Sequence, residues 1–119
     1  MRCLLFLGFT GCGLWGPTDE EVQFTEDMAR ALCERIRVCD HGQFSSDYFG
    51  MQDCRRSQEA ELLERLKERA VAGCSLDTEE AADTVSDVKD MDCERYYEAA
   101  YVEAKLLDSI WIDCEGEDE

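Results

Sequence analysis

Eight cysteines spread over 119 residues constrain the fold of this chain more than any other feature of its sequence. Six of them follow the first dozen residues, at spacings free of any Cys-x-x-Cys motif: Cys33, Cys39, Cys54, Cys74, Cys93 and Cys114. An even number of cysteines in a small exported domain indicates a disulfide framework, here of three bridges, each contributing about 2–4 kcal/mol. Reduced cysteines that act as small buried apolar side chains are the alternative.

The first residues of the chain indicate the compartment. Arg2 supplies a positive charge, and residues 3–9 form a short apolar run. Thr10 and Gly11, both small, precede Cys12. This is the order of a secretory signal. The run is too short for a transmembrane helix, which needs roughly 20 residues. The alternative is a buried strand or helix start of a cytosolic domain.

Residues 9–12, Phe-Thr-Gly-Cys, resemble the lipobox of bacterial lipoproteins, in which signal peptidase II cuts before a cysteine that carries diacylglycerol. The resemblance implies that residues 1–11 are a signal peptide, that Cys12 is lipidated and that residues 12–18 form a tether. Gly13, rather than an aspartate, follows the modified cysteine, which by likeness to lipoproteins favours the outer membrane.

The charge of the chain restricts its partners. Loss of Arg2 with the signal peptide would leave 11 of the 12 basic residues against 29 acidic ones, a formal net charge of −18. Nucleic-acid binding requires clustered lysines and arginines, and the longest basic run is Arg55-Arg56. Nucleic acid is therefore excluded as a partner, whereas cations or a basic envelope protein fit this surface.

Helical patterns fill residues 19–114 and predict an all-α, disulfide-stapled bundle of about four helices. Thr18 with Glu21 forms a capping box before a helix over 19–39. Three more helices are expected over about 51–72, 77–91 and 93–114. In the last one, apolar residues and cysteines alternate in four-and-three spacing from Cys93 to Cys114. Residues 40–50 read as a loop, and residues 115–119 as a solvated acidic tail.

Helix geometry limits which cysteines can pair. Cys33 and Cys39 share one helix and are separated by roughly 9 Å along its axis, beyond the ~7 Å that a disulfide allows. They must therefore have different partners. Of the fifteen possible connectivities, antiparallel packing of successive helices favours one. It consists of Cys39–Cys54, Cys74–Cys114 and Cys33–Cys93.

Several positions together resemble the small cysteine-rich lipoproteins abundant in myxobacteria. The likeness covers most of residues 1–93 and departs from the family at Thr84, where such proteins often carry another cysteine, and in the helical C-terminal third. It implies an envelope location and no established enzymatic activity. Beside the lipobox-like start, the residues that carry it are Cys33, Cys39, Phe44, Asp47, Tyr48, Cys54, the run Cys74-Ser75-Leu76-Asp77, Ala81 and Cys93.

The sequence offers little for metal binding or catalysis. Cys33, Cys39 and His41 do not have a familiar zinc-ligand spacing. Residues 83–92 carry oxygen ligands but lack the glycine-containing loop of an EF-hand. His41 is the only histidine of the chain and reads as the end of a helix. We therefore expect no metal, no cofactor and no enzymatic activity.

Aromatic side chains cluster on the last helix, and at helical spacing they are expected in the core, as for Tyr97 and Trp111 on the seam. The alternative is a binding surface, because other aromatic and acidic side chains of this helix lie off the apolar seam. Its expected residues are Tyr96, Tyr101, Glu98 and Glu103, with Phe44, Tyr48 and Phe49 as further exposed aromatics. Such residues are favoured at interfaces. The expected function is that of a non-enzymatic, lipid-anchored protein of the outer membrane that contacts another envelope component. The alternative is a secreted or periplasmic ligand- or cation-binding module without lipid.

Overall fold

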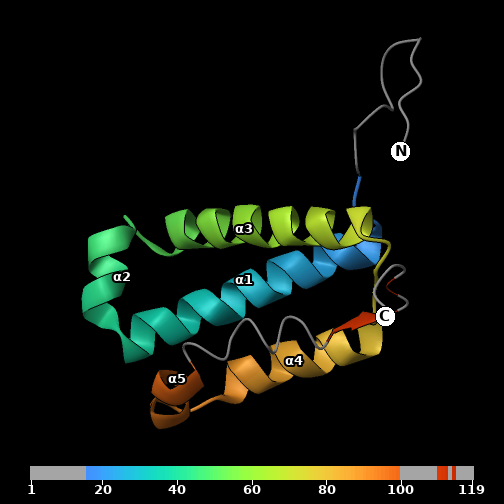
Figure 1. Cartoon of the computed structure of the whole chain (residues 1–119). Helices are drawn as coiled ribbons and strands as arrows, with labels where there is room; N and C mark the ends of the chain where they lie inside the picture. Colours follow the sequence, from blue (N-terminus) through green and yellow to red (C-terminus); the bar gives the residue numbers. More distant parts are fainter. Residues whose placement is uncertain (1–15, 100–109, 113, 115–119) are drawn as a thin grey trace.

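Helices dominate the chain, as Figure 1 shows for a computed structural model that describes residues 16–99, 110–112 and 114. The elements follow in the order α1 (Asp19–Cys39), α2 (His41–Asp47), α3 (Met51–Val71), β1 (Ser75–Leu76), α4 (Thr78–Asp90), α5 (Cys93–Ala99) and β2 (Trp111–Ile112). The predicted small, helical, disulfide-rich fold is confirmed. The two short strands add a minimal antiparallel sheet, in which Ser75 faces Ile112 and Leu76 faces Trp111.

The helices begin where the sequence provides caps. At the start of α1, the Thr18 hydroxyl accepts a hydrogen bond from the Glu21 backbone N–H at 3.2 Å. The Glu21 carboxylate in turn accepts one from the Thr18 backbone N–H at 2.9 Å. Asp77 caps α4 by accepting a bond from the Glu80 N–H at 3.2 Å. These bonds satisfy backbone donors that have no partner inside the helix.

The end of α3 is equally well defined by its backbone bonds. Gly73 adopts a φ of 88°, a left-handed conformation that disfavours residues with a side chain. The Gly73 N–H donates to the carbonyl of Ala70, and the Cys74 N–H donates to that of Arg69. This pair of bonds is a Schellman motif. It reverses the chain and delivers Cys74 directly to the start of β1.

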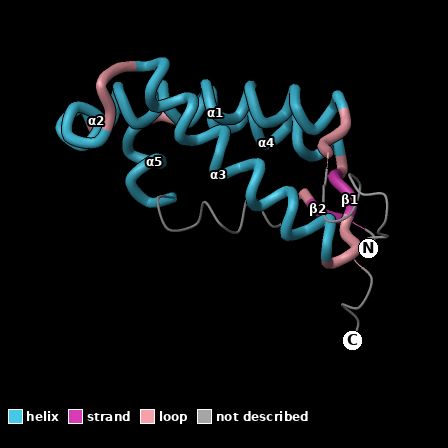
Figure 2. The backbone as a smooth tube through the Cα atoms, turned by 90° about the horizontal axis from the view of Figure 1, so that it is seen from above, coloured by secondary structure: helices cyan, strands magenta, loops and turns pink. Residues whose placement is uncertain are grey.

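Helix α1 is the centre of the molecule. It packs against α3 on one side and α4 on the other, and α2 and α5 contact it towards its C-terminal end. The two strands lie at the opposite end, which we call the sheet end; the other is the α2/α5 end (Figures 1 and 2). Because the chain enters α1 at the sheet end, the tether predicted for residues 12–18 would attach there.

The apolar core is divided in the same way. The larger cluster runs along α1 and reaches the sheet end, where Leu76 and Trp111 pack against it. Its buried members are Phe24, Met28, Ala29, Ala31, Leu32, Leu62, Ala81, Val88 and Ile110. The smaller cluster lies at the α2/α5 end and consists of Cys33, Phe44 and Cys54, with Ile36, Tyr48 and Met51 against them.

The predicted loop over residues 40–50 contains a short helix, α2. Asp40 ends α1 and also caps α2, because its carboxylate accepts a bond from the Gln43 N–H at 3.4 Å. Phe44 is buried, and this contact supports a helix that is too short to be stable by itself. His41 consequently begins α2 and does not end α1.

The predicted helix over residues 93–114 is wrong at its C-terminal end. Helix α5 spans Cys93–Ala99, whereas Trp111 and Ile112 form β2. Ile110 is fully buried, and its carbonyl accepts a hydrogen bond from the Asp77 N–H at 2.8 Å. Pairing with the turn between α3 and α4 therefore overrides the helical spacing there. The middle of the predicted seam, residues 100–109, lies outside the described residues.

Two of the three predicted disulfides are wrong. The structure joins Cys33 to Cys54 and Cys39 to Cys93, with Cα atoms 6.0 and 5.2 Å apart, whereas Cys74–Cys114 is confirmed. The error comes from α2, which stands between the end of α1 and the start of α3 and keeps the two apart (Figure 1). Helix α3 therefore reaches α1 at Cys33, and Cys39 is left to pair with α5.

Candidate functional site

The binding surface predicted on the last helix is described only in part. Tyr101 and Glu103 lie outside the described residues, as does Cys12. Glu98 is exposed, but Tyr96 is half-buried, with its ring centroid 5.8 Å from that of Tyr97. Tyr97, which the seam pattern places in the core, is 60% exposed. The described part of the surface is thus an acidic residue beside a pair of tyrosines.

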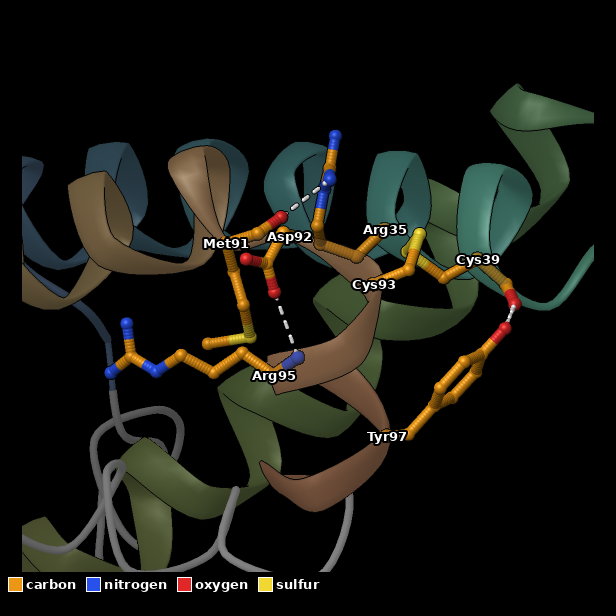
Figure 3. Close-up of a disulfide and its surroundings, with 7 residues drawn as sticks. All are labelled: Arg35, Cys39, Met91, Asp92, Cys93, Arg95 and Tyr97. Carbon is orange, nitrogen blue, oxygen red and sulfur yellow. Dashed lines mark hydrogen bonds between the residues drawn. A yellow bond between two sulfur atoms is a disulfide. The ribbon is translucent and has the colours of Figure 1, made fainter.

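Helix α5 is fixed to the end of α1 by a covalent and a polar contact (Figure 3). The Cys39–Cys93 disulfide joins the last residue of α1 to the first residue of α5. About one turn further on, the Tyr97 hydroxyl donates a hydrogen bond to the Cys39 carbonyl. The exposed ring is therefore held at both ends, and α5 presents its side chains from a fixed position.

The turn between α4 and α5 is held from α1 as well. Arg35 extends towards it and donates from Nη1 to the Met91 carbonyl at 2.7 Å (Figure 3). Asp92 then caps α5 by accepting a bond from the Arg95 N–H at 2.8 Å. The Nε atom of Arg35 is buried and has no hydrogen-bond partner among the described residues. Arg35 and Asp92 are structural residues that the sequence pattern did not single out.

The second group of aromatics does not form the expected patch. Phe44 is buried and packs against Tyr48 with ring centroids 5.7 Å apart, and the Tyr48 hydroxyl accepts a bond from Gln58. Both belong to the smaller core cluster. Phe49 alone is fully exposed. Its backbone N–H donates to the Asp53 carboxylate at 3.0 Å, so this ring stands on an ordered turn.

A hollow of about 260 Å³ lies between the first half of α1 and the start of α4. Its apolar surface comes from Phe24 on α1, from Leu76 on β1 and from the α4 side chains Ala81, Ala82 and Val85. Four polar residues complete the lining: Glu20, Gln23, Asp27 and Thr78.

The hollow exists because α4 presents small side chains to α1. Ala81 is buried beside α1, and Ala82 is exposed next to it, where longer side chains would fill the space. The sequence pattern did not single out Ala82. The sequence does contain a signal for such a groove. It is a pair of adjacent alanines between acidic residues, on a helix that packs through a single apolar stripe.

Metal-binding groups do not assemble in the part of the chain that is described. Cys33 and Cys39 enter separate disulfides, so neither supplies a thiolate next to His41. Residues 83–90 belong to α4, and Asp92 caps α5. Within residues 16–99 and 110–112, no group of three or more histidine, cysteine or carboxylate side chains is arranged to hold a metal ion.

Among the helices described, none is long and apolar enough to cross a membrane. Comparison of the chain with protein-family models, with curated proteins and with solved structures returned no match.

Proposed function

We propose that the protein is a non-enzymatic, lipid-anchored protein of the cell envelope that binds another envelope component. The observation that carries the proposal is the oxidation state of its cysteines. Every cysteine in the described residues is in a disulfide, which is characteristic of an oxidising, exported environment. The lipobox-like start and the resemblance to small cysteine-rich lipoproteins of myxobacteria add the anchor and the envelope.

The distance between the proposed anchor and the folded part supports an orientation. Only seven positions separate Cys12 from the first residue of α1, so an extended tether spans at most about 25 Å. The sheet end would therefore lie near the membrane. The α2/α5 end, with Tyr97, Glu98 and Phe49 exposed, would point away from it and be accessible to other envelope proteins.

A binding role fits these side chains better than catalysis. His41, the only histidine of the chain, is exposed on α2, and the cysteine thiols of the described residues are consumed in disulfides. General acid–base or thiolate chemistry would need such groups side by side in a cleft. Exposed aromatic and acidic side chains on a rigid scaffold are instead typical of recognition surfaces.

Mass spectrometry of the protein extracted from membranes tests the anchor. The wild-type protein should begin at Cys12 with a diacylglycerol modification and should fractionate with the outer membrane. Cys12→Ala should abolish the modification and the cleavage, whereas the matched variant Cys3→Ala, inside the proposed signal peptide, should leave both intact. An unmodified mature protein in the soluble fraction would refute the anchor and favour a secreted or periplasmic binding module.

A further inference from the structure

We propose that the hollow between α1 and α4 binds a basic segment of a partner protein, which inserts one apolar side chain flanked by lysines or arginines. The inference rests on the binding role proposed above and adds a second contact surface, nearer the sheet end than the exposed side chains of the α2/α5 end, together with the chemistry of the segment that it binds. It does not depend on the lipid, because the hollow is formed entirely by side chains of the folded domain.

The base of the hollow suits an apolar side chain. Phe24 and Ala81 are almost fully buried, and Leu76 and Val85 are half-buried around them. Filling this space would remove the exposed carbon surface of both helices and of the inserted group from water, which is favourable in proportion to the area buried.

The size of the hollow favours a side chain over a whole small molecule. Pockets that enclose small organic ligands usually measure about 300–1,000 Å³. The hollow measures about 260 Å³ and is open to solvent along the two helices. It can hold one large apolar side chain, while the remainder of the ligand stays outside, as in helix or strand docking to a groove.

The charges around the hollow select a basic partner. Glu20 and Asp27 line it, and no lysine or arginine does so among the described residues. Asp27 is partly compensated by Arg30, whose Nη1 lies 3.5 Å from its carboxylate, but no ion pair to Glu20 is present among the described residues. Helix α4 extends the acidic surface and carries Lys89 as its one basic residue beside the acids Glu79, Glu80, Asp83, Asp87 and Asp90.

Helix α3 provides a contrast inside the same molecule. It carries five of the twelve basic residues of the chain, namely Arg55, Arg56, Arg65, Lys67 and Arg69. It also carries five acidic residues and so has no net charge, whereas α1 and α4 together carry eleven acidic against four basic residues. The side on which the hollow lies is therefore negatively charged. A basic segment is attracted to that side, and an acidic segment or an anionic lipid surface is repelled by it.

Three short peptides separate the apolar and the charged contributions. The probe is the acetylated and amidated pentapeptide KKLKK; KKSKK lacks the apolar side chain, and EELEE reverses the charge. Each is titrated into the full, oxidised, unlipidated chain labelled with ¹⁵N and followed by amide chemical shifts. We expect KKLKK to change the amide chemical shifts of Phe24, Ala81 and Val85 and to bind roughly tenfold or more tightly than KKSKK. Its affinity should fall when the salt concentration is raised from about 0.02 to about 0.3 M.

Paired variants test the location. Ala82→Trp should fill the hollow and weaken KKLKK binding by roughly tenfold or more, whereas Ala60→Trp, at an exposed alanine of α3, should leave it unchanged. Glu20→Gln should weaken binding about two- to threefold at low salt, and Glu26→Gln, an exposed acid of α1 that does not line the hollow, should not. Circular dichroism checks that each variant keeps its helices.

Four results would overturn the proposal. These are equal binding of KKLKK and KKSKK, equal loss of binding in Ala82→Trp and Ala60→Trp, and chemical-shift changes confined to another surface. The fourth is stronger binding after Trp15→Ala, a substitution in the tether predicted for residues 12–18. The last would mean that the chain's own tether occupies the hollow. Because the titration uses unlipidated protein, failure here leaves the anchor intact, and failure of the anchor leaves this measurement unaffected.

Discussion

The two ends of the molecule are stabilised in different ways. At the sheet end, the larger apolar cluster, the strand pair and the Schellman motif hold the turn between α3 and α4, and one disulfide, Cys74–Cys114, closes it. The guanidinium of Arg69 also lies over the ring of Trp111. Its Cζ atom is 5.9 Å from the ring centroid, a distance that allows a cation–π interaction.

The α2/α5 end has fewer apolar contacts and more covalent ones. Helices α2 and α5 have seven residues each, which is too short for a stable isolated helix. Two disulfides, Cys33–Cys54 and Cys39–Cys93, tie α3 and α5 to the last turns of α1. The comparison indicates that disulfides compensate for the smaller apolar cluster at the α2/α5 end.

The largest effect is expected from removing the buried bridge at the α2/α5 end. Cys33→Ala with Cys54→Ala should lower the free energy of unfolding by about 4–5 kcal/mol. The cross-link closes a loop with a sequence separation of 21 residues, worth about 3 kcal/mol in the chain-entropy model, and the rest comes from the space left by two fully buried sulfurs. Urea denaturation measures the change.

Peptide mapping of the unreduced wild-type protein is the control for that variant. Trypsin cuts after Arg35 and Arg37 and so separates Cys33 from Cys39. A second protease that cleaves before aspartate, at Asp40, Asp47 and Asp53, separates Cys39 from Cys54. The linked fragments should contain Cys33 with Cys54. A cost below about 2 kcal/mol, or a different linkage, would remove the basis for the comparison.

Next in size is the loss of apolar contact at the sheet end. Ile110→Ala should cost about 3 kcal/mol, because Ile110 is fully buried in the larger cluster and its removal leaves a cavity. Ile112→Ala, two residues further on at a 41% exposed position, should cost less than about 1 kcal/mol. Similar costs at the two positions would mean that the sheet end depends on its bridge as much as the other end does.

Local signals in the sequence predicted most element boundaries. The helix predicted over 19–39 coincides with α1, since Thr18 and Glu21 form their capping box whatever lies nearby. The helix predicted over about 51–72 ends within one residue of α3, because Gly73 adopts a left-handed backbone conformation that favours glycine. Such features depend on a few neighbouring residues and can be read from sequence.

The features that the sequence analysis missed depend on distant contacts. Helix α2 requires Phe44 to be buried against other elements, and β2 requires a partner strand near residue 75, far away in the sequence. A loop over residues 40–50 would bring Cys39 next to Cys54, whereas α2 separates them, so the predicted pairs Cys39–Cys54 and Cys33–Cys93 are wrong. The hollow also escaped notice, because a groove is a property of two helices that pack together and neither helix reveals it alone.

A smaller effect is expected at the cap that starts α4. Asp77→Ala should cost about 1 kcal/mol, because the Glu80 N–H loses its acceptor. Asp77→Asn should recover most of this stability, since an asparagine side chain also accepts at this position. Thermal unfolding of the three proteins measures the difference. If the asparagine variant is as unstable as the alanine variant, the Asp77 carboxylate contributes through its charge at the helix end and the hydrogen bond is secondary.

The smallest effect is expected from the hydroxyl that holds α5. Tyr97→Phe keeps the ring and removes the hydrogen bond to the Cys39 carbonyl, which should cost about 0.5 kcal/mol because the tyrosine is more than half exposed. With the Cys39–Cys93 bridge intact, the change should stay local and speed amide exchange in α5 about two- to threefold. Tyr48→Phe, which removes the acceptor of the Gln58 bond, should affect α2 and α3 instead. Faster exchange throughout the molecule after Tyr97→Phe would mean that the bridge does not isolate α5, and the two ends would then unfold as one unit.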